Sequence, residues 1–256
     1  KGWSQDHDIY KTNVSIEPSA VFEDGKPLIK AITPNGDIAN GDPYYNLHKG
    51  PAYTTGAGTN AAQIVDSELT ETDPNYYIGA KARIRNGNWI NNFVPVTNYD
   101  PQTHTLTLSR NITGLGSGIK YFLEGLKVYL DMPGEWAWQN GILYVMTKEQ
   151  DDPAKHLIEA DSRNHGFYLK NNQSYIVIDG FEIKQTKLGN MYDGAIYFSS
   201  ALNSGNIIIQ NCKIYDAGDN GIFLRGTWDA GGTYPSNITI QKNLISRVGG
   251  HGIMLR

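Results

Sequence analysis

Short runs in which apolar and polar residues alternate fill the last third of the chain. Three of these runs resemble one another, and they begin 31 residues apart, at Tyr175, Asn206 and Asn237. They read YIVIDGFEI, NIIIQNCKI and NITIQKNLI. Alternation places every second side chain, such as Ile207 and Ile209, on the same face of a strand. Each run therefore predicts a strand with one buried face.

A second kind of run alternates with the first and has a glycine near its start. The four copies are HGFYLK (165–170), DGAIYF (193–198), NGIFLR (220–225) and HGIMLR (251–256). A repeat of about 20 to 50 residues built from short strands is typical of a solenoid. The stretches between the runs do not resemble hairpin turns of an antiparallel sandwich and suit the turns and third strand of a coil. The pattern therefore predicts a parallel β-helix, whose stacked coils place like side chains ~4.8 Å apart.

Alignment of the four glycine-marked runs defines one slot before each strand and one slot after it. The slot before the strand contains His165, Asp193, Asn220 and His251, and the slot after it contains Lys170, Phe198, Arg225 and Arg256. Alternation points Tyr168, Phe223 and Met254 outward. The run DGAIYF fits less well, because Ile196 and Phe198 resemble its inward pair. A shift of one residue in this coil would move Asp193 into the preceding turn.

The first 150 residues lack this period and contain signals for antiparallel hairpins instead. Asp24-Gly25 separates two short apolar runs within residues 19–31, and Asn140-Gly141 separates two more. Asp-Gly and Asn-Gly are the pairs that two-residue hairpin turns favour. Residues 34–63 are rich in Gly, Asn and Pro and predict a long loop.

These patterns divide the chain into three expected segments. They are an N-terminal lead-in to the β-helix with a hairpin and a long loop (1–63), an inserted antiparallel β module (64–147) and the β-helix coils (148–256). The end of a solenoid exposes the edges of its sheets and needs a cap. Residues 251–256 match the strand of an internal coil, and no cap follows them. We therefore expect the chain to be part of a longer solenoid, truncated at its C-terminal end.

Composition argues against several classes of function. The formal net charge is -4 at pH 7 and the isoelectric point is about 5.9, so nucleic acid is not expected as a partner. No apolar stretch approaches the ~18 residues of a membrane-spanning helix, so no membrane span is expected. The single cysteine, Cys212, excludes an internal disulfide and a cysteine-rich metal site. Within NIIIQNCKI it reads as a small buried apolar residue.

A segment that precedes the coils resembles a known group of proteins. In bacterial right-handed β-helix proteins that act on polysaccharides, a Leu-Asp-x-Pro-Gly-Glu-Trp block precedes a Leu-Tyr-Val strand and an Asp-Pro linker into the coils. The matching residues are Leu130, Asp131, Pro133, Gly134, Glu135, Trp136, Leu143, Tyr144, Val145, Asp152 and Pro153. Residues 1–12 and 21–31 also resemble the N-terminus of that module. The resemblance is to β-helix glycoside hydrolases, those of families 120 and 141 in particular.

The resemblance implies an all-β fold, namely a right-handed parallel β-helix with an inserted small antiparallel β module. It also implies a glycan-active enzyme that is secreted, periplasmic or at the cell surface. Members of these families continue for several more coils, which generally carry the catalytic carboxylates. Within the matching block we interpret Pro133-Gly134 as a turn that Asp131 caps and under which Trp136 packs, so neither Asp131 nor Glu135 is assigned a catalytic role.

Candidate catalytic residues lie in the turns that precede the glycine-marked strands. Asp193, Asp216 and Asp219 fall on neighbouring coils. Two of them could reach the carboxyl separations of glycosidases, ~5 to 5.5 Å for retention or ~6.5 to 9.5 Å for inversion. We take Asp193 and Asp219 as this pair, and His251 as a base or a hydrogen-bonding residue. The candidates for substrate binding are Phe223, Trp228, Arg225 and Arg256. In any solenoid, such positions also hold polar residues that only stabilise turns.

Three functions remain open on these residues. The first is a glycoside hydrolase that uses two carboxylates and requires no cofactor or metal. The second is a polysaccharide lyase, in which Lys170, Arg225 and Arg256 neutralise a uronate, with Ca²⁺ as an accessory ion, while a base removes the C5 proton. The third is a non-catalytic carbohydrate-binding or adhesive solenoid. All three take a polysaccharide or oligosaccharide as partner, and the negative charge of the chain favours the hydrolase over the lyase.

Overall fold

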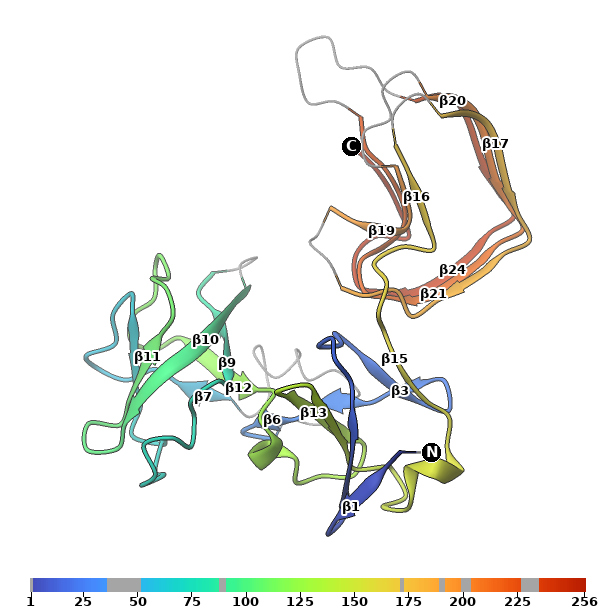
Figure 1. Cartoon of the computed structure of the whole chain (residues 1–256). Helices are drawn as coiled ribbons and strands as arrows, with labels where there is room; N and C mark the ends of the chain where they lie inside the picture. The colour runs from blue at the N-terminus through green and yellow to red at the C-terminus, as the bar shows by residue number, and fades with distance from the viewer. Residues whose placement is uncertain are drawn as a thin grey trace. The chain divides into compact units, whose positions relative to one another are not determined.

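A computed structural model organises the chain into short β-strands, and none of the described residues lies in an α-helix (Figure 1). The structure describes residues 2–35, 52–87, 91–170, 173–188, 192–198, 204–226 and 235–256. Two compact units are present, one formed by residues 1–17 and 23–158 and the other by residues 18–22 and 159–256. The second unit contains the repeated runs, and the first contains both hairpin signals.

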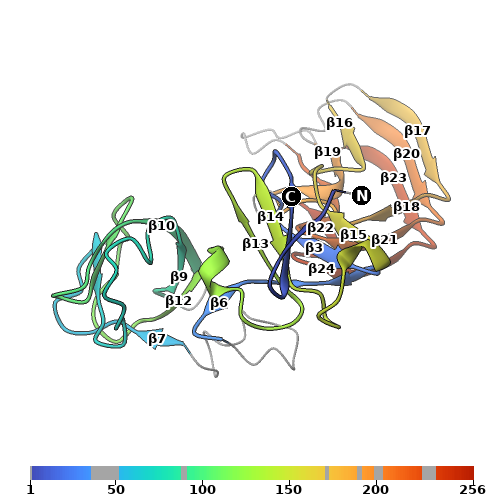
Figure 2. The ribbon, with the colours of Figure 1, turned by 60° about the horizontal axis from the view of Figure 1, so that its bottom comes forward.

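Three parallel sheets form the second unit, and each complete coil contributes one strand to each sheet (Figures 1 and 2). The first sheet contains β16 (Phe167–Leu169), β19 (Gly194–Phe198), β22 (Asn220–Leu224) and β25 (Ile253–Leu255). The second contains β17 (Ser174–Asp179), β20 (Gly205–Gln210) and β23 (Ser236–Gln241). The third contains β18 (Glu182–Lys184), β21 (Lys213–Ala217) and β24 (Leu244–Val248). The predicted parallel β-helix is therefore confirmed.

The predicted period is visible in the register of these sheets. Two columns of isoleucine run through the second sheet: Ile176, Ile207 and Ile238, and Ile178, Ile209 and Ile240. Ile207 and Ile209 are completely buried. Burial of each such side chain contributes roughly 1.5 to 3 kcal/mol relative to exposure. The interior of the unit is thus a continuous column of stacked apolar side chains.

The second coil has the one-residue shift that its sequence suggested. Phe198 pairs with Leu224 of the next coil and is completely buried. The glycine alignment was therefore wrong for this coil, because Phe198 faces the interior instead of occupying the slot after the strand. The same shift moves Asp193 by one residue relative to the next coil. It lies beside Asp219 rather than beside Asn220, since Asn220 pairs with the residue that follows Asp193.

The antiparallel unit consists mainly of two sheets. One has the order β1 (Ser4–Asp6), β2 (Ile9–Asn13), β14 (Ile142–Val145), β13 (Glu135–Gln139) and β5 (Ile29–Lys30). The other has the order β6 (Ile32–Thr33), β12 (Lys120–Glu124), β9 (Lys81–Arg85), β10 (Asn91–Asp100), β11 (Thr105–Leu108) and β8 (Gln63–Val65), and β7 (Tyr53–Thr54) also pairs with β12. The 3₁₀ helices η3 (Lys127–Tyr129) and η4 (Pro153–Lys155) follow β12 and β14. The core of this unit includes the completely buried Ile84, Leu106 and Leu123.

The boundaries between the two units fall within β3 (Val21–Glu23) and β15 (Ile158–Ala160), which form a small sheet with β4 (Lys26–Pro27). The sequence assigned residues 1–63 to the lead-in of the β-helix. Apart from residues 18–22, their described strands belong to the antiparallel unit. The reason is that most of them pair with strands between residues 105 and 145.

Both predicted hairpins are present. Asp24-Gly25 joins β3 to β4, Asn140-Gly141 joins β13 to β14, and all four residues have positive φ. A type I′ turn requires positive φ at both central residues, and Asn, Asp and Gly adopt it at the lowest energetic cost. Of the predicted loop 34–63, residues 36–51 lie outside the described residues, and Tyr53–Thr54 form β7.

The block at residues 130–136 forms a turn, but Glu135 caps it rather than Asp131. Glu135 Oε2 accepts the backbone N–H groups of Asp131 and Met132, both at 3.1 Å. The Glu135 side chain is completely buried, and its Oε1 has no hydrogen-bond partner among the described residues. Burial raises the pKa of Glu135 to about 7. Trp136 is buried, as predicted.

Candidate functional site

The His165 imidazole and the Asp193 carboxylate form the central pair of the candidate site. His165 precedes β16 and Asp193 precedes β19, so both lie where a turn leads into the first sheet. His165 Nδ1 is 2.9 Å from Asp193 Oδ1 and 3.0 Å from the carbonyl oxygen of Gly194. Both of these oxygens are acceptors, so Nδ1 carries the proton of the neutral ring and Nε2 keeps the lone pair. Asp193 Oδ1 also accepts the Gly194 N–H at 2.9 Å.

Asp219 lies beside Asp193 on the next coil. Gly194 pairs with Asn220, and both the backbone N–H and Nδ2 of Asn220 donate to the carbonyl oxygen of Asp193, at 3.3 and 2.6 Å. The residues one position earlier, Asp193 and Asp219, are therefore neighbours across a strand spacing of ~4.8 Å. Both are buried. The structure thus places Asp193 and Asp219, which the sequence suggested as a pair, at neighbouring positions on adjacent coils.

His251 continues the same row on the next coil. Its backbone N–H donates to Asn220 Oδ1 at 2.8 Å, and its ring Nδ1 is 3.2 Å from the same oxygen. Asn220 therefore links His251 to Asp193, because its Nδ2 donates to the Asp193 carbonyl group. His251 is exposed to solvent, whereas His165 at the other end of the row is half-buried. The polar slot before the strands is thus a connected network rather than a set of separate residues.

Asp216, the third carboxylate considered from the sequence, is part of a salt bridge. Arg247, on the next coil, donates from Nε and Nη2 to the two Asp216 carboxylate oxygens, at 2.6 and 2.9 Å. Bidentate pairs of this kind hold both partners in one orientation. Asp216 therefore stabilises the stacking of β21 on β24 and is not available to act on a substrate.

A column of aromatic rings follows the outward face of the first sheet. Tyr168, Tyr197 and Phe223 are partners in β16, β19 and β22. The ring centroids of Tyr168 and Tyr197 are 5.7 Å apart, and those of Tyr197 and Phe223 are 5.4 Å apart in a stacked arrangement. The His165 ring stacks on Tyr168 at 5.1 Å. Phe223 is completely buried, whereas Tyr168 is 48% exposed, so Tyr168 is the ring of this column that has a face for a sugar.

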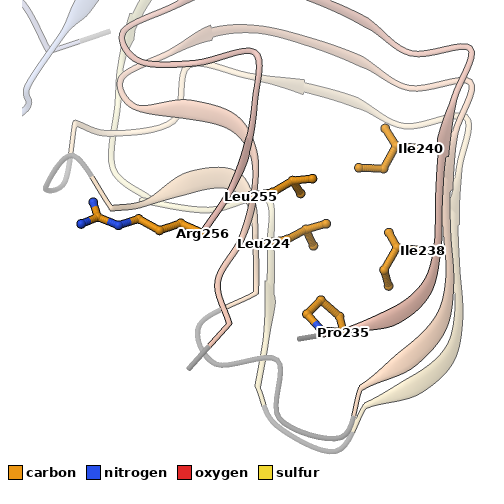
Figure 3. Close-up of a pocket in the computed structure, with 6 residues that line it drawn as sticks. All are labelled: Leu224, Pro235, Ile238, Ile240, Leu255 and Arg256. Carbon is orange, nitrogen blue, oxygen red and sulfur yellow. The ribbon is translucent and has the colours of Figure 1, made fainter. Parts of the chain in front are cut away.

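Cationic residues follow three strands of the first sheet directly. They are Lys170 after β16, Arg225 after β22 and Arg256 after β25. Figure 3 shows that Arg256 points away from the apolar interior of the coil. Its guanidinium group lies 4.5 Å from the centroid of the Tyr192 ring. Trp228, the remaining predicted binding residue, lies outside the described residues.

A hollow of about 640 Å³ adjoins the first coil and is lined in part by His165, Phe167 and Phe181. Phe181 is 47% exposed, and its ring packs edge-on against Phe167 at 4.9 Å. The lining of this hollow thus includes an exposed aromatic ring and His165, whose imidazole contacts Asp193. A second hollow, of about 490 Å³, is the interior of the last described coil, where Leu224 faces Ile238 (Figure 3). Apart from Arg256, its lining consists of apolar side chains.

The carboxylates of the candidate site have few metal ligands around them. Among the described residues, a group of three side chains close enough to share an ion is formed by Glu23, Asp24 and His156, all of the antiparallel unit. Within the same part of the chain, Asp193 and Asp219 have no third His, Cys, Asp or Glu ligand of this kind.

Comparisons with known proteins identify the architecture. A protein-family model described as a right-handed beta helix region matches residues 151–256. A solved structure described as a glycoside hydrolase matches with a TM-score of 0.64 at 11% sequence identity, over 88% of this chain and 48% of that one. The fold is a right-handed parallel β-helix. The antiparallel unit precedes its coils, and the chain spans about half the length of the structure that it matches.

Two further findings complete the comparison. No curated protein matches the chain in sequence. The part of the chain that the structure describes has no helix that is both long and apolar enough to cross a membrane.

The sequence did not select four residues of the site: His165, Tyr168, Phe181 and Tyr197. A signal for Tyr197 existed, because an inward Ile196 and Phe198 require the residue between them to face outward. The signal for His165 was weak. The glycine alignment placed it in the same slot as Asp193, but such slots hold turn-stabilising polar residues in any solenoid.

Proposed function

We propose that the protein is a glycoside hydrolase that acts on a polysaccharide or oligosaccharide outside the cytoplasm, as a secreted, periplasmic or cell-surface protein. The observation that carries the proposal is the in-register placement of Asp193 and Asp219 on neighbouring coils. The strand spacing of ~4.8 Å is close to the ~5 to 5.5 Å between the carboxyl groups of retaining glycosidases. We therefore infer retention of configuration, by chemistry that requires no cofactor.

Asp193 is the nucleophile in this proposal. The Gly194 N–H and His165 Nδ1 both point to its Oδ1, an arrangement that suits an ionised, acceptor-only carboxylate. An Asp193 oxygen attacks the anomeric carbon while Asp219 donates a proton to the leaving oxygen, and the bond between that carbon and that oxygen breaks. Water then attacks the same carbon, gives a proton to Asp219 and releases the Asp193 carboxylate.

Aromatic and cationic groups near the carboxylates supply the binding of the sugar. Tyr168 and Phe181 are both about half exposed. The Tyr168 ring stacks on His165, and Phe181 lines the same hollow as His165. Sugar rings pack on such faces through their C–H groups, as other apolar surfaces do. Arg225 and Arg256 are exposed and can donate hydrogen bonds to hydroxyl or carboxylate groups of the same chain. The structural similarity to a glycoside hydrolase supports the assignment to this class.

A polysaccharide lyase is the second candidate, and the row of Lys170, Arg225 and Arg256 favours it. Three cations that follow strands of one sheet suit a polymer that carries a carboxylate on each sugar. His165 is oriented for the required base, because its Nδ1 is held by Asp193 and its Nε2 keeps a lone pair. A non-catalytic carbohydrate-binding solenoid would use the same surface without turnover.

The purified chain, assayed with neutral and uronate-containing polysaccharides, separates these functions. A hydrolase produces new reducing ends without the ultraviolet absorbance of an unsaturated uronate, whereas a lyase produces that absorbance. A binding module retains the glycan and yields neither product. Retention of configuration at the new reducing end, followed by nuclear magnetic resonance, tests the inferred carboxyl separation.

Substitution of the carboxylates tests the site itself. We expect Asp193→Asn and Asp219→Asn each to lower turnover by about 10²-fold or more, because each removes a group that forms or breaks a bond. Asp179→Asn is the matched control, since Asp179 is an exposed carboxylate at the end of β17. Unchanged turnover in both site variants contradicts the assignment of the pair.

A further inference from the structure

A histidine and two carboxylates meet where the β3–β4 hairpin contacts the segment after η4. Glu23 ends β3, Asp24 begins the hairpin turn, and His156 follows η4. His156 Nδ1 lies 2.8 Å from Asp24 Oδ2 and 3.5 Å from Glu23 Oε1. One ligand atom from each residue lies within 4.8 Å of the others. All three residues belong to the antiparallel unit.

The second oxygen of each carboxylate is held by a backbone N–H group. The Lys148 N–H donates to Glu23 Oε2 at 3.1 Å, and the Leu157 N–H donates to Asp24 Oδ1 at 2.9 Å. These two bonds leave Glu23 Oε1 and Asp24 Oδ2 turned toward His156 Nδ1. Metal-binding carboxylates are commonly held by hydrogen bonds of this kind. Glu23 Oε1 and His156 Nδ1 are therefore oriented before any ion arrives, and Asp24 Oδ2 lies beside them.

The Glu23 carboxylate is the most buried of the three side chains. It is only 4% exposed, and its Oε1 pairs with His156 Nδ1 at 3.5 Å, a separation longer than that of a charge-assisted hydrogen bond. A buried carboxylate oxygen whose partner lies at this distance is energetically costly. A cation between Glu23 and His156 removes that cost.

Asp151 completes the arrangement on the other side of the imidazole ring. Asp151 Oδ1 lies 2.8 Å from His156 Nε2. Without an ion, the Nε2–H group donates to Asp151 and the Nδ1–H group donates to Asp24 Oδ2 at 2.8 Å. An ion bound at Nδ1 replaces the Nδ1 proton and leaves the bond from Nε2–H to Asp151 in place. Metal-binding histidines almost always donate their second N–H group to a carboxylate, a carbonyl or a water in this way.

We propose that Glu23, Asp24 and His156 bind a divalent transition-metal ion, Zn²⁺ in particular. Imidazole combined with carboxylate suits Zn²⁺, whereas Ca²⁺ and Mg²⁺ prefer oxygen ligands alone. Bonds of ~2.0 to 2.2 Å place tetrahedral ligand atoms about 3.4 Å apart, which is close to the 3.5 Å between Glu23 Oε1 and His156 Nδ1. The Asp24 side chain is 56% exposed, so it can rotate to the same separation and leave a fourth position open to water.

The bound ion joins two segments that are far apart in the sequence. Asp24 and His156 are separated by 132 positions, and the hairpin and the segment after η4 contain no covalent cross-link between them. An ion that binds this folded arrangement and not the unfolded chain stabilises it by mass action. The site is therefore structural, and it is independent of the carboxylates on the β-helix.

Metal titration of the purified full chain, freed of metal by a chelator and then dialysed, tests the proposal. Co²⁺ is the first probe, because its visible absorption reports a tetrahedral site, and Zn²⁺ titration calorimetry is the second. We expect one ion per chain, displacement of Co²⁺ by Zn²⁺, and a higher thermal midpoint of unfolding with Zn²⁺. His156→Gln and Asp24→Asn each remove a ligand and weaken Zn²⁺ binding by about tenfold or more. Asp151→Asn removes the orienting carboxylate and weakens it by about 10- to 100-fold.

His7→Gln is the matched control, because His7 is 94% exposed and pairs with a single carboxylate, Asp6. It leaves Zn²⁺ binding unchanged, and so does Asp193→Asn on the β-helix. The absence of stoichiometric binding to the wild-type chain overturns the proposal. Binding that is equally strong in His156→Gln and Asp24→Asn overturns it as well. If His156→Gln does not fold, Asp24→Asn decides alone, since its side chain is mostly exposed.

Discussion

His165 and Asp193 lie on adjacent coils of the β-helix, with the imidazole Nδ1 2.9 Å from the carboxylate Oδ1. The ring also stacks on Tyr168 and contacts Tyr197 at 5.2 Å between centroids. The orientation of His165 is therefore set by the stacking of two coils rather than by either coil alone. A side chain held in this way can act on a substrate through the carboxylate that it positions.

His165→Gln should lower the kcat of the proposed hydrolase by about tenfold or more and change KM little. The imidazole orients the Asp193 nucleophile and does not contact the bound sugar in the proposed mechanism, so its loss affects the transition state selectively. Steady-state kinetics that separate kcat from KM check this. His7→Gln should behave as the wild type. A change confined to KM would place His165 in substrate binding instead.

Tyr168→Ala should weaken oligosaccharide binding by about three- to tenfold, which is the effect of losing one aromatic contact. Tyr168 is the exposed ring of the aromatic column, so its replacement removes a sugar contact without opening a cavity in the core. The control is Tyr175→Ala, because Tyr175 is 83% exposed on the second sheet. Titration calorimetry measures both affinities. Equal losses in the two variants would show that the sugar does not bind along the first sheet.

Gly249→Ala should destabilise the β-helix unit by about 1 to 3 kcal/mol, because overpacking forces the backbone to move. A Cβ atom at Gly249 would collide with the carbonyl oxygen of Gly218 on the preceding coil. Gly252→Ala is the control on the same coil, since its added Cβ would make an ordinary contact 3.9 Å from Ile245. The free energy of unfolding in urea, followed by a probe in the β-helix unit, should fall for the first variant only.

The stability of the antiparallel unit should decrease as the pH rises from about 5 to about 7. Burial raises the pKa of Glu135 from 4.5 to about 7, so in this range the folded state keeps a proton that the unfolded chain has released. Stability is therefore greatest below the unfolded pKa and falls by up to about 1.4 kcal/mol per pH unit until the folded pKa is reached.

Glu135→Gln provides the comparison for this pH dependence. The amide remains neutral throughout, and its Oε1 can still accept the N–H groups of Asp131 and Met132. Unfolding free energies measured at several pH values should therefore give a flatter profile for the variant. Parallel profiles in the two proteins would mean that another group causes the decrease.

The coils and the hairpins could be predicted from the sequence because each depends on local information. Alternation in NIIIQNCKI marks a strand with one buried face, and in-register stacking requires that strand to recur at a constant interval. Asp-Gly and Asn-Gly pairs favour the positive φ of a tight turn between two strands. Asp24-Gly25 and Asn140-Gly141 both adopt it. The pairing of Asp193 with Asp219 was also suggested, since both precede strands that stack.

The sequence by itself thus determined the β-helix, its interior and the rows on which polar residues lie. Tertiary structure decided which of those polar residues meet. The shift of one coil placed Asp193 beside Asp219 instead of Asn220, Arg247 took Asp216 into a salt bridge, and hairpin contacts placed Glu23 beside His156. The reason is physical. Strand periodicity arises from the backbone of a few neighbouring residues, whereas a hydrogen bond between distant side chains depends on how the intervening coils and turns close.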